Sequence, residues 1–225
     1  MKLSNKSSIF SNVKTIFFDY DGTLHDSLKI YAPAFRKAYA FLVENGHANP
    51  RDWSDKDISH WLGFTSKDMW QQFMSNLNKD IKDKASTIIG AEMKKQLAGG
   101  KATLYTGTIN TLKYLKSKEY NLVFISNCGT YYKETSNSLF GLSNYFDSLV
   151  CSEEYNYIPK WKVLEKIKSK YPRDMVIVGD RLQDIEAGCK NNIFTIGCTY
   201  GYGNLSELNS ADTLITSICQ LKELL

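Results

Sequence analysis

Segments with helical and strand character alternate through the second half of this chain, and that alternation constrains the fold more than any other feature. Strands are predicted over residues 121–125, 147–151, 175–178, 193–196 and 212–215, and helices over 108–118, 131–139, 160–170, 184–191 and 218–225. Strands joined through helices favour a parallel sheet. The strand segments are almost continuously apolar, as expected where helices cover both faces. The pattern predicts an α/β fold with a doubly wound parallel sheet.

One more apolar strand, residues 13–18 (VKTIFF), lies near the N-terminus and is followed by a long helical stretch. Apolar residues recur at helical spacing over 28–44, and the helical period continues over 55–62, 66–77 and 81–97. No strand is predicted between residues 28 and 97. We therefore expect an α/β core domain formed by residues 1–26 and 104–225, with an all-helical domain inserted over 27–103.

Composition narrows the class of protein. The 225 residues are 43% hydrophobic, enough for a sizeable core, and the net charge is only +4. Lysines alternate with acids, as in residues 79–84, which is typical of a solvated helix face and not of a nucleic-acid-binding patch.

The first twelve residues are polar, and no apolar run reaches the ~18 residues of a membrane span. The five cysteines are widely spaced without a C-x-x-C motif, so we expect a cytoplasmic protein with reduced thiols that binds neither nucleic acid nor a membrane. The sequence does not predict its oligomeric state.

Carboxylates follow two of the predicted strands at the point where each ends. Asp19 and Asp21 come directly after the first strand, and Asp180 follows residues 175–178 with Asp184 four residues further on. The carboxyl ends of parallel strands border the ligand crevice of an α/β fold. Clustered carboxylates repel one another unless a cation is present, and their oxygens suit Mg²⁺. Asp19, Asp180 and Asp184 are therefore candidate magnesium ligands.

Two further polar residues have chemistry that suits a phosphoryl group. Ser126 follows the predicted strand 121–125, and Lys160 begins a predicted helix after Pro159. A hydroxyl and a point positive charge both bind phosphoryl oxygens well. Lys162 is an alternative to Lys160, but a helix start favours Lys160 as an anion-binding residue.

In this order, Asp19-x-Asp21-Gly22-Thr23, Ser126, Lys160 and Gly179-Asp180-x-x-x-Asp184 resemble the four motifs of the haloacid dehalogenase superfamily. The helical insert resembles its type 1 cap, within the branch of phosphoglycolate phosphatase-like and β-phosphoglucomutase-like proteins. The resemblance covers nearly the whole chain. It implies a Rossmann-like core and a Mg²⁺-dependent phosphatase that hydrolyses a small phosphorylated metabolite, whether phosphoglycolate, a sugar phosphate or a nucleotide.

The resemblance also implies a role for each motif residue. Asp19 would attack phosphorus and form an aspartyl-phosphate, while Asp21 would protonate the leaving oxygen and then activate water. Mg²⁺ would be held by Asp19, the backbone carbonyl of Asp21, Asp180 and Asp184. The phosphoryl group would be bound by Thr23, Ser126, Asn127 and Lys160.

Other functions stay open at this point. A phosphomutase would need the cap to hold a second phosphate, and residues 27–103 show no arginine-based clamp. A non-catalytic phosphate-binding or regulatory protein would be expected to lose some of the carboxylates, yet all four are present. Dehalogenation is disfavoured because true dehalogenases of the superfamily lack the second aspartate, here Asp21.

The sequence leaves several side chains without a firm role. His25 could line the site, although a solvent-facing or structural position is the preferred interpretation. The tryptophans of the insert are expected to pack in its core and not to form a stacking pocket. No role is predicted for Arg181, and Lys67 is as readily a surface lysine as a substrate contact.

Overall fold

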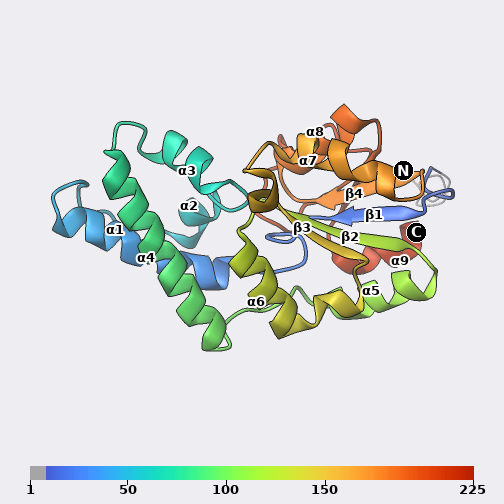
Figure 1. Cartoon of the computed structure of the whole chain (residues 1–225), viewed down its shortest axis with the longest axis horizontal. Coiled ribbons are helices and arrows are strands. Elements are labelled where there is room, and N and C mark those ends of the chain that lie inside the picture. Colours follow the sequence, from blue (N-terminus) through green and yellow to red (C-terminus); the bar gives the residue numbers. More distant parts are fainter. Residues whose placement is uncertain (1–8) are drawn as a thin grey trace. The chain divides into compact units, whose positions relative to one another are not determined.

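A computed structural model describes residues 9–225, and these contain a six-stranded sheet. Figure 1 shows the sheet with its helices. The strands are β1 (Thr15–Phe18), β2 (Asn121–Ser126), β3 (Ser148–Cys151), β4 (Met175–Gly179), β5 (Phe194–Cys198) and β6 (Thr213–Ile215). Their order across the sheet is β3-β2-β1-β4-β5-β6, and every neighbouring pair is parallel. The predicted parallel sheet of the α/β class is confirmed.

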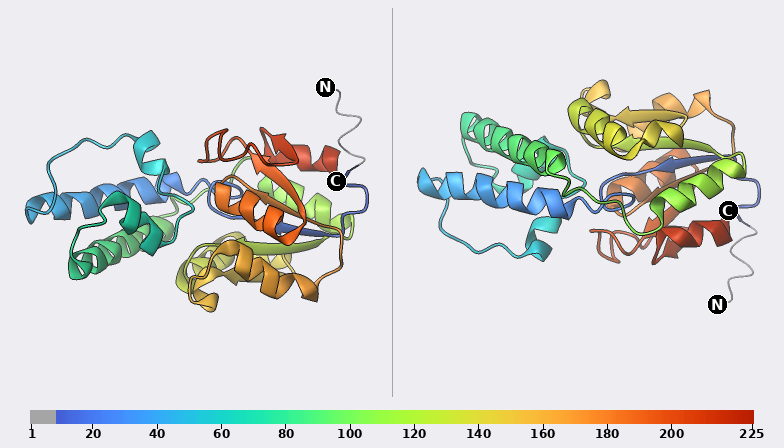
Figure 2. Two further views of the ribbon diagram at one scale, coloured as in Figure 1. Left: turned by 90° about the horizontal axis from the view of Figure 1, so that it is seen from above. Right: turned by 90° about the horizontal axis from the view of Figure 1, so that it is seen from below.

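Helices cover both faces of this sheet because successive strand residues point to opposite sides (Figure 1, Figure 2). On one face, Phe18 and Phe124 belong to an apolar cluster that includes residues of α5 (Thr108–Ser117) and α9 (Leu221–Leu224). On the other face, Phe17 packs in a cluster with residues of α7 (Lys160–Ile167) and α8 (Leu182–Asn191). The two clusters make the α/β unit a three-layer structure.

The described chain divides into two compact units, one over Asp26–Thr103 and the other formed by the segments up to His25 and from Leu104 onward. The sequence predicts the first boundary one residue later, after residue 26, and the second boundary at the same place, before residue 104. The unit over Asp26–Thr103 is helical and contains α1 (Leu28–Glu44), α2 (Asp55–Ser59), α3 (Ser66–Phe73) and α4 (Lys79–Ala98). Three of these helices start at a side-chain cap, because Ser54, Thr65 and Asn78 each accept a hydrogen bond from a backbone N–H of the first turn.

Aromatic packing fills the interior of the helical unit. The ring of Trp53 meets Phe35, Tyr39 and Phe73 at centroid distances of 5.3–5.5 Å, and it is 8% exposed. The indole N–H of Trp70 donates to the hydroxyl of Ser86 at 2.7 Å. These tryptophans therefore serve as core residues, as the sequence favoured.

Helix ends are where the structure departs from the predicted elements. The helix predicted over 66–77 stops at Phe73, because Met74 has left the helical region with φ −145° and ψ 70°, and Asn78 then caps the next helix. The helix predicted over 160–170 ends at Ile167 and tightens into a 3₁₀ turn, Lys168–Lys170, just before Tyr171-Pro172, because a residue before proline avoids the helical region. The last helix likewise begins as a 3₁₀ turn, Ile218–Gln220.

Among residues 9–225, no helix combines the length and the apolar character that crossing a bilayer would require. The expectation that the first twelve residues carry no targeting segment concerns residues that lie mostly outside the described part of the chain.

Candidate active site

The site forms at the point where the order of the strands reverses. From β1 the chain builds β2 and β3 on one side, and then returns to place β4 against the other side of β1. Asp19 directly follows β1, and Asp180 directly follows Gly179, the last residue of β4. Ligands of doubly wound sheets bind at this switch point, outside the carboxyl ends of the strands. The sheet order thus brings two aspartates together that are far apart in the sequence.

Three buried carboxylates meet there. One carboxylate oxygen from each of Asp19, Asp180 and Asp184 lies within 4.8 Å of the other two. Their exposed fractions are 3%, 0% and 0%. Asp184 lies in the first turn of α8, where its Oδ2 accepts a hydrogen bond from the backbone N–H of Arg181 at 3.0 Å. Three of the four predicted magnesium ligands are therefore adjacent, while the backbone carbonyl of Asp21 as a fourth ligand stays a prediction.

A single lysine neutralises part of this charge. Nζ of Lys160 lies 2.7 Å from Oδ1 of Asp19 and 2.6 Å from Oδ1 of Asp184. Lys160 is the first residue of α7, whereas the exposed Lys162 lies over the ring of Trp161 at 5.2 Å from its centroid. Of the two candidate lysines, Lys160 is the one that reaches the carboxylates.

The charge balance of the cluster fits a divalent cation. Burial raises the pKa of Asp19 well above its ordinary value, and the charge of Asp184 adds to that effect while Lys160 opposes it. Burial, and then the charge of Asp184, raises the pKa of Asp180 to about 7. Burial alone would lower the pKa of Lys160, but the two carboxylates outweigh it and raise the pKa. One ammonium for three carboxylates leaves negative charge that Mg²⁺ would offset, and carboxylate oxygens are the donors it prefers.

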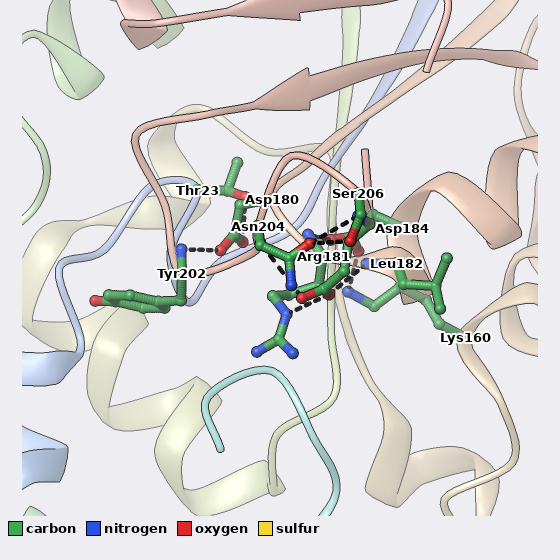
Figure 3. A network of polar contacts seen from close by, with 10 residues as sticks. Thr23, Lys160, Asp180, Arg181, Leu182, Asp184, Tyr202, Asn204 and Ser206 are labelled. Carbon is green, nitrogen blue, oxygen red and sulfur yellow. Dashed lines mark hydrogen bonds and ion pairs between the residues drawn. The ribbon is translucent and has the colours of Figure 1, made fainter. Parts of the chain in front are cut away.

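The Gly22-Thr23 step of the first motif packs against the carboxylate of Asp180. Gly22 has a φ of +86°, and a Cβ at this position would lie 2.2 Å from Oδ2 of Asp180. Thr23 Oγ1 donates to Oδ1 of the same carboxylate at 3.1 Å, and the backbone N–H of Tyr202 donates to Oδ2 at 2.7 Å (Figure 3). The hydroxyl of Thr23 is thus already used by Asp180, and its role in phosphate binding stays a prediction.

Ser126 lies at the same edge of the sheet. It is the last residue of β2, which pairs directly with β1, and it is 2% exposed. Asn127 directly follows it in the sequence. The phosphate-binding roles of Ser126 and Asn127 stay predictions, supported by this position beside Asp19.

Asp21 has a different environment from Asp19. Its side chain is 16% exposed, and its Oδ1 accepts a hydrogen bond from Oη of Tyr132 at 2.8 Å. Nδ1 of His25 lies 3.5 Å from the same oxygen. His25 is 0% exposed and stacks on Tyr20, so of the two positions preferred from the sequence the solvent-facing one is wrong and the structural one agrees with the packing.

The structure gives positions to residues whose roles the sequence left open, such as Arg181, and to others that it did not single out, such as Glu207. Arg181 is buried, and its Nε donates to Glu207 at 2.9 Å, which anchors the loop after β5 beside α8. The hydroxyl of Tyr200 donates to the backbone carbonyl of Thr23 at 2.9 Å. No local pattern marks Glu207, whereas Tyr132 could have been suspected because it follows Ser126 closely. Lys67 is an exposed residue of α3 in the helical unit.

The strand order, the acidic cluster at the switch point and the inserted helical unit together define a class of α/β enzymes that use clustered carboxylates for their chemistry. A sequence model described as "Haloacid dehalogenase-like hydrolase" matches residues 16–198, and the chain belongs to that family. The resemblance inferred from the four motifs is therefore confirmed, and the protein is a hydrolase of this family.

Named relatives agree with this assignment, and a solved structure agrees with the fold. The chain is 29% identical to a phosphoglycolate phosphatase of Aquifex aeolicus, over 87% of this chain and 89% of that protein. It is 26% identical to a glyceraldehyde 3-phosphate phosphatase of Methanothermobacter thermautotrophicus, over 95% of this chain and 100% of that protein. The crystal structure of a predicted phosphatase from Clostridium acetobutylicum has the same fold, with a TM-score of 0.80 at 24% identity, covering 94% of this chain and 98% of that one.

Proposed function

We propose that this protein is a Mg²⁺-dependent phosphatase that hydrolyses a small phosphate monoester through an aspartyl-phosphate formed on Asp19. The observation that carries the proposal is the buried group of Asp19, Lys160, Asp180 and Asp184 at the switch point of the sheet. Family membership supports hydrolysis. The relatives named for phosphoglycolate and glyceraldehyde 3-phosphate support a substrate of two or three carbons more than a nucleotide.

In the first step, a carboxylate oxygen of Asp19 forms a bond to phosphorus while the bond from phosphorus to the alcohol oxygen breaks. Asp21 gives its proton to that departing oxygen, so that an alcohol leaves and not an alkoxide. Asp21 suits this task because it lies two residues from Asp19 and is the more exposed of the two carboxyls.

In the second step, Asp21 accepts a proton from water as the water oxygen bonds to phosphorus. The bond from phosphorus to Asp19 breaks, which releases inorganic phosphate and restores the carboxylate. The ammonium of Lys160 and the hydroxyl of Ser126 would stabilise the charge on the phosphoryl oxygens in both steps. Mg²⁺ held by Asp19, Asp180 and Asp184 would supply further positive charge for the same oxygens.

Phosphate release from a panel of esters, with Mg²⁺ or with EDTA, tests the proposal. The panel contains phosphoglycolate, glyceraldehyde 3-phosphate, a hexose phosphate and a nucleoside monophosphate. We expect Mg²⁺-dependent release from the small esters by the wild type, and a fall to background in Asp19→Asn. The melting temperature of Asp19→Asn should not decrease, because the substitution removes a charge from a crowded acidic cluster.

A thermal-shift titration with Mg²⁺ separates the possible failures. A cation that binds the folded state raises the melting temperature, so Mg²⁺ should stabilise the wild type and stabilise Asp180→Asn less. Wild-type turnover in Asp19→Asn would contradict the mechanism. A folded protein that binds Mg²⁺ but releases phosphate from no ester would favour a phosphomutase or a non-catalytic binder instead.

A further inference from the structure

We propose that Tyr132, oriented by His25, is a positioning residue for the carboxyl group of Asp21 and thereby controls the two proton transfers of the reaction. The inference rests on the proposed function, because it concerns the carboxyl that serves as acid and base in that mechanism. The two residues that it adds, Tyr132 and His25, lie outside the four motifs. Their hydrogen bonds join them to Asp21 and to each other.

The contact between Tyr132 and Asp21 joins two distant parts of the sequence. Tyr132 lies in the first turn of α6 (Thr130–Phe140), and Asp21 lies in the loop after β1. Oη of Tyr132 donates to Oδ1 of Asp21 at 2.8 Å across 111 residues of sequence. A hydrogen bond from a hydroxyl to a carboxyl oxygen is short and directional, so it orients the acceptor. It holds one oxygen of a carboxyl that is otherwise close to solvent.

His25 is the second hydrogen-bond partner of this hydroxyl. Its Nδ1 lies 3.0 Å from Oη of Tyr132. The hydroxyl has a single hydrogen, and that hydrogen points to Asp21, so Nδ1 must carry the proton and donate to Oη. Nε2 of His25 is buried with no hydrogen-bond partner among the described residues. This agrees with a neutral ring whose hydrogen is on Nδ1, since an unpaired acceptor is tolerated more readily than an unpaired buried N–H.

Ring packing keeps these donors in place. The imidazole of His25 stacks on the ring of Tyr20 at 4.9 Å between centroids and 13° between planes, and both side chains are 0% exposed. The ring of Tyr132 meets Tyr20 edge-on at 5.8 Å. Tyr20 lies between Asp19 and Asp21 in the sequence. Its ring therefore supports Tyr132 and His25, the two residues that orient the carboxyl of Asp21. Donors held in this way orient a catalytic group before substrate binds.

The proposal separates proton transfer from attack on phosphorus. The substitution Tyr132→Phe keeps the ring and removes only the hydroxyl. It should slow the steps in which Asp21 gives or accepts a proton and leave attack by Asp19 unchanged. Two esters distinguish these steps, because the alcohol of phosphoglycolate needs a proton to leave, whereas p-nitrophenolate leaves without one.

The decisive measurement is kcat/KM of wild type and Tyr132→Phe on phosphoglycolate and on p-nitrophenyl phosphate, with Mg²⁺ present. This constant includes only the steps up to departure of the alcohol. We expect a loss of about 10- to 100-fold on the alkyl ester and less than about twofold on the aryl ester. Because the later water step also uses Asp21, the variant should release p-nitrophenolate in a burst followed by a slower steady rate.

Two further variants complete the experiment. Tyr131→Phe is the matched control, because Tyr131 is the neighbouring tyrosine of the same helix and is 54% exposed, and it should behave as wild type on both esters. His25→Phe keeps a ring on Tyr20 but removes the donor to Tyr132. It should show the same preference for the aryl ester, with a smaller loss on the alkyl ester.

Each outcome has a distinct meaning. Equal losses on both esters, or no loss on either, would overturn the positioning role of Tyr132 while leaving the phosphatase intact. A lower melting temperature with equal losses would indicate that the hydroxyl only stabilises the fold. A wild-type protein inactive on both esters would overturn the proposed function, and the role of Tyr132 with it.

Discussion

The two units of this protein differ in how deeply their ion pairs are buried. In the helical unit, at least one side chain of each such pair lies in water: Lys79 and Asp83 are 3.0 Å apart with 86% and 63% of their side chains exposed, and Lys37, 58% exposed, pairs with the largely buried Glu92. Its interior is aromatic. In the α/β unit, the pairs of Lys160 with Asp19 and Asp184 have side chains that are 0–4% exposed.

The difference shows where the chain accepts an energetic cost. Exposed ion pairs contribute little to stability, because water screens them and their side chains lose entropy on pairing. Buried charges lose their hydration, and their mutual attraction often fails to compensate. A fold selected for stability alone would fill the edge of β1 and β4 with apolar side chains. The buried acidic cluster therefore marks the place where chemistry has been favoured over stability.

The largest expected effect on stability comes from removing the single buried cation. Lys160→Met leaves Asp19 and Asp184 without their partner, and should lower the free energy of unfolding by about 3–5 kcal/mol in the absence of Mg²⁺. Urea denaturation with and without Mg²⁺ measures this loss, which the metal should reduce. Lys162→Met is the control, since that lysine is exposed, and it should leave the unfolding midpoint unchanged. A small decrease in the free energy of unfolding of Lys160→Met would show that the buried carboxylates cost little stability without their partner.

A slightly smaller effect is expected from the aromatic interior of the helical unit. Trp53→Ala removes a ring that packs on three others, and should destabilise this unit by about 3 kcal/mol. Hydrogen exchange resolved by peptide should show faster exchange over residues 26–103, while β1 and β4 keep their protection. Equal loss of protection in both units would show that the two units unfold together, which would contradict a separate stability for the helical unit.

The smallest effect is expected from the exposed pair of α4. Lys79→Ala breaks its contact with Asp83, yet the melting temperature should stay unchanged, because both side chains are largely in water. A clear decrease in the melting temperature would show that surface pairs support the helical unit after all.

Sequence reasoning worked where a local pattern determines the structure. The apolar spacing of residues 28–44 predicts α1 with the bounds that the structure shows. The rule that parallel strands end at one edge was sufficient to associate Asp19 with Asp180, since each directly follows a strand. Lys160 could be preferred over Lys162 because it begins a helix.

Side-chain contacts between distant segments were beyond that reasoning. His25 is buried because Tyr20 stacks on one face of its ring and Tyr132 approaches from α6, and no spacing in the sequence encodes those contacts. Glu207 reaches Arg181 only because the loop after β5 turns back toward α8. Such contacts depend on the direction of individual side chains, which the period of a strand or helix does not fix.

The adjacency of β1 and β4 also determines when the protein acquires its acidic cluster. Thr23 and Asp180, which share a hydrogen bond, are 157 residues apart, so a ribosome must synthesise most of the chain before they can meet. A nascent chain that ends before β4 contains Asp19 but neither Asp180 nor Asp184. The repulsion among the three carboxylates is therefore absent while the first strands assemble. It enters only when β4 pairs with β1 and brings Asp180 beside Asp19, and Lys160, which is synthesised before β4, offsets part of it.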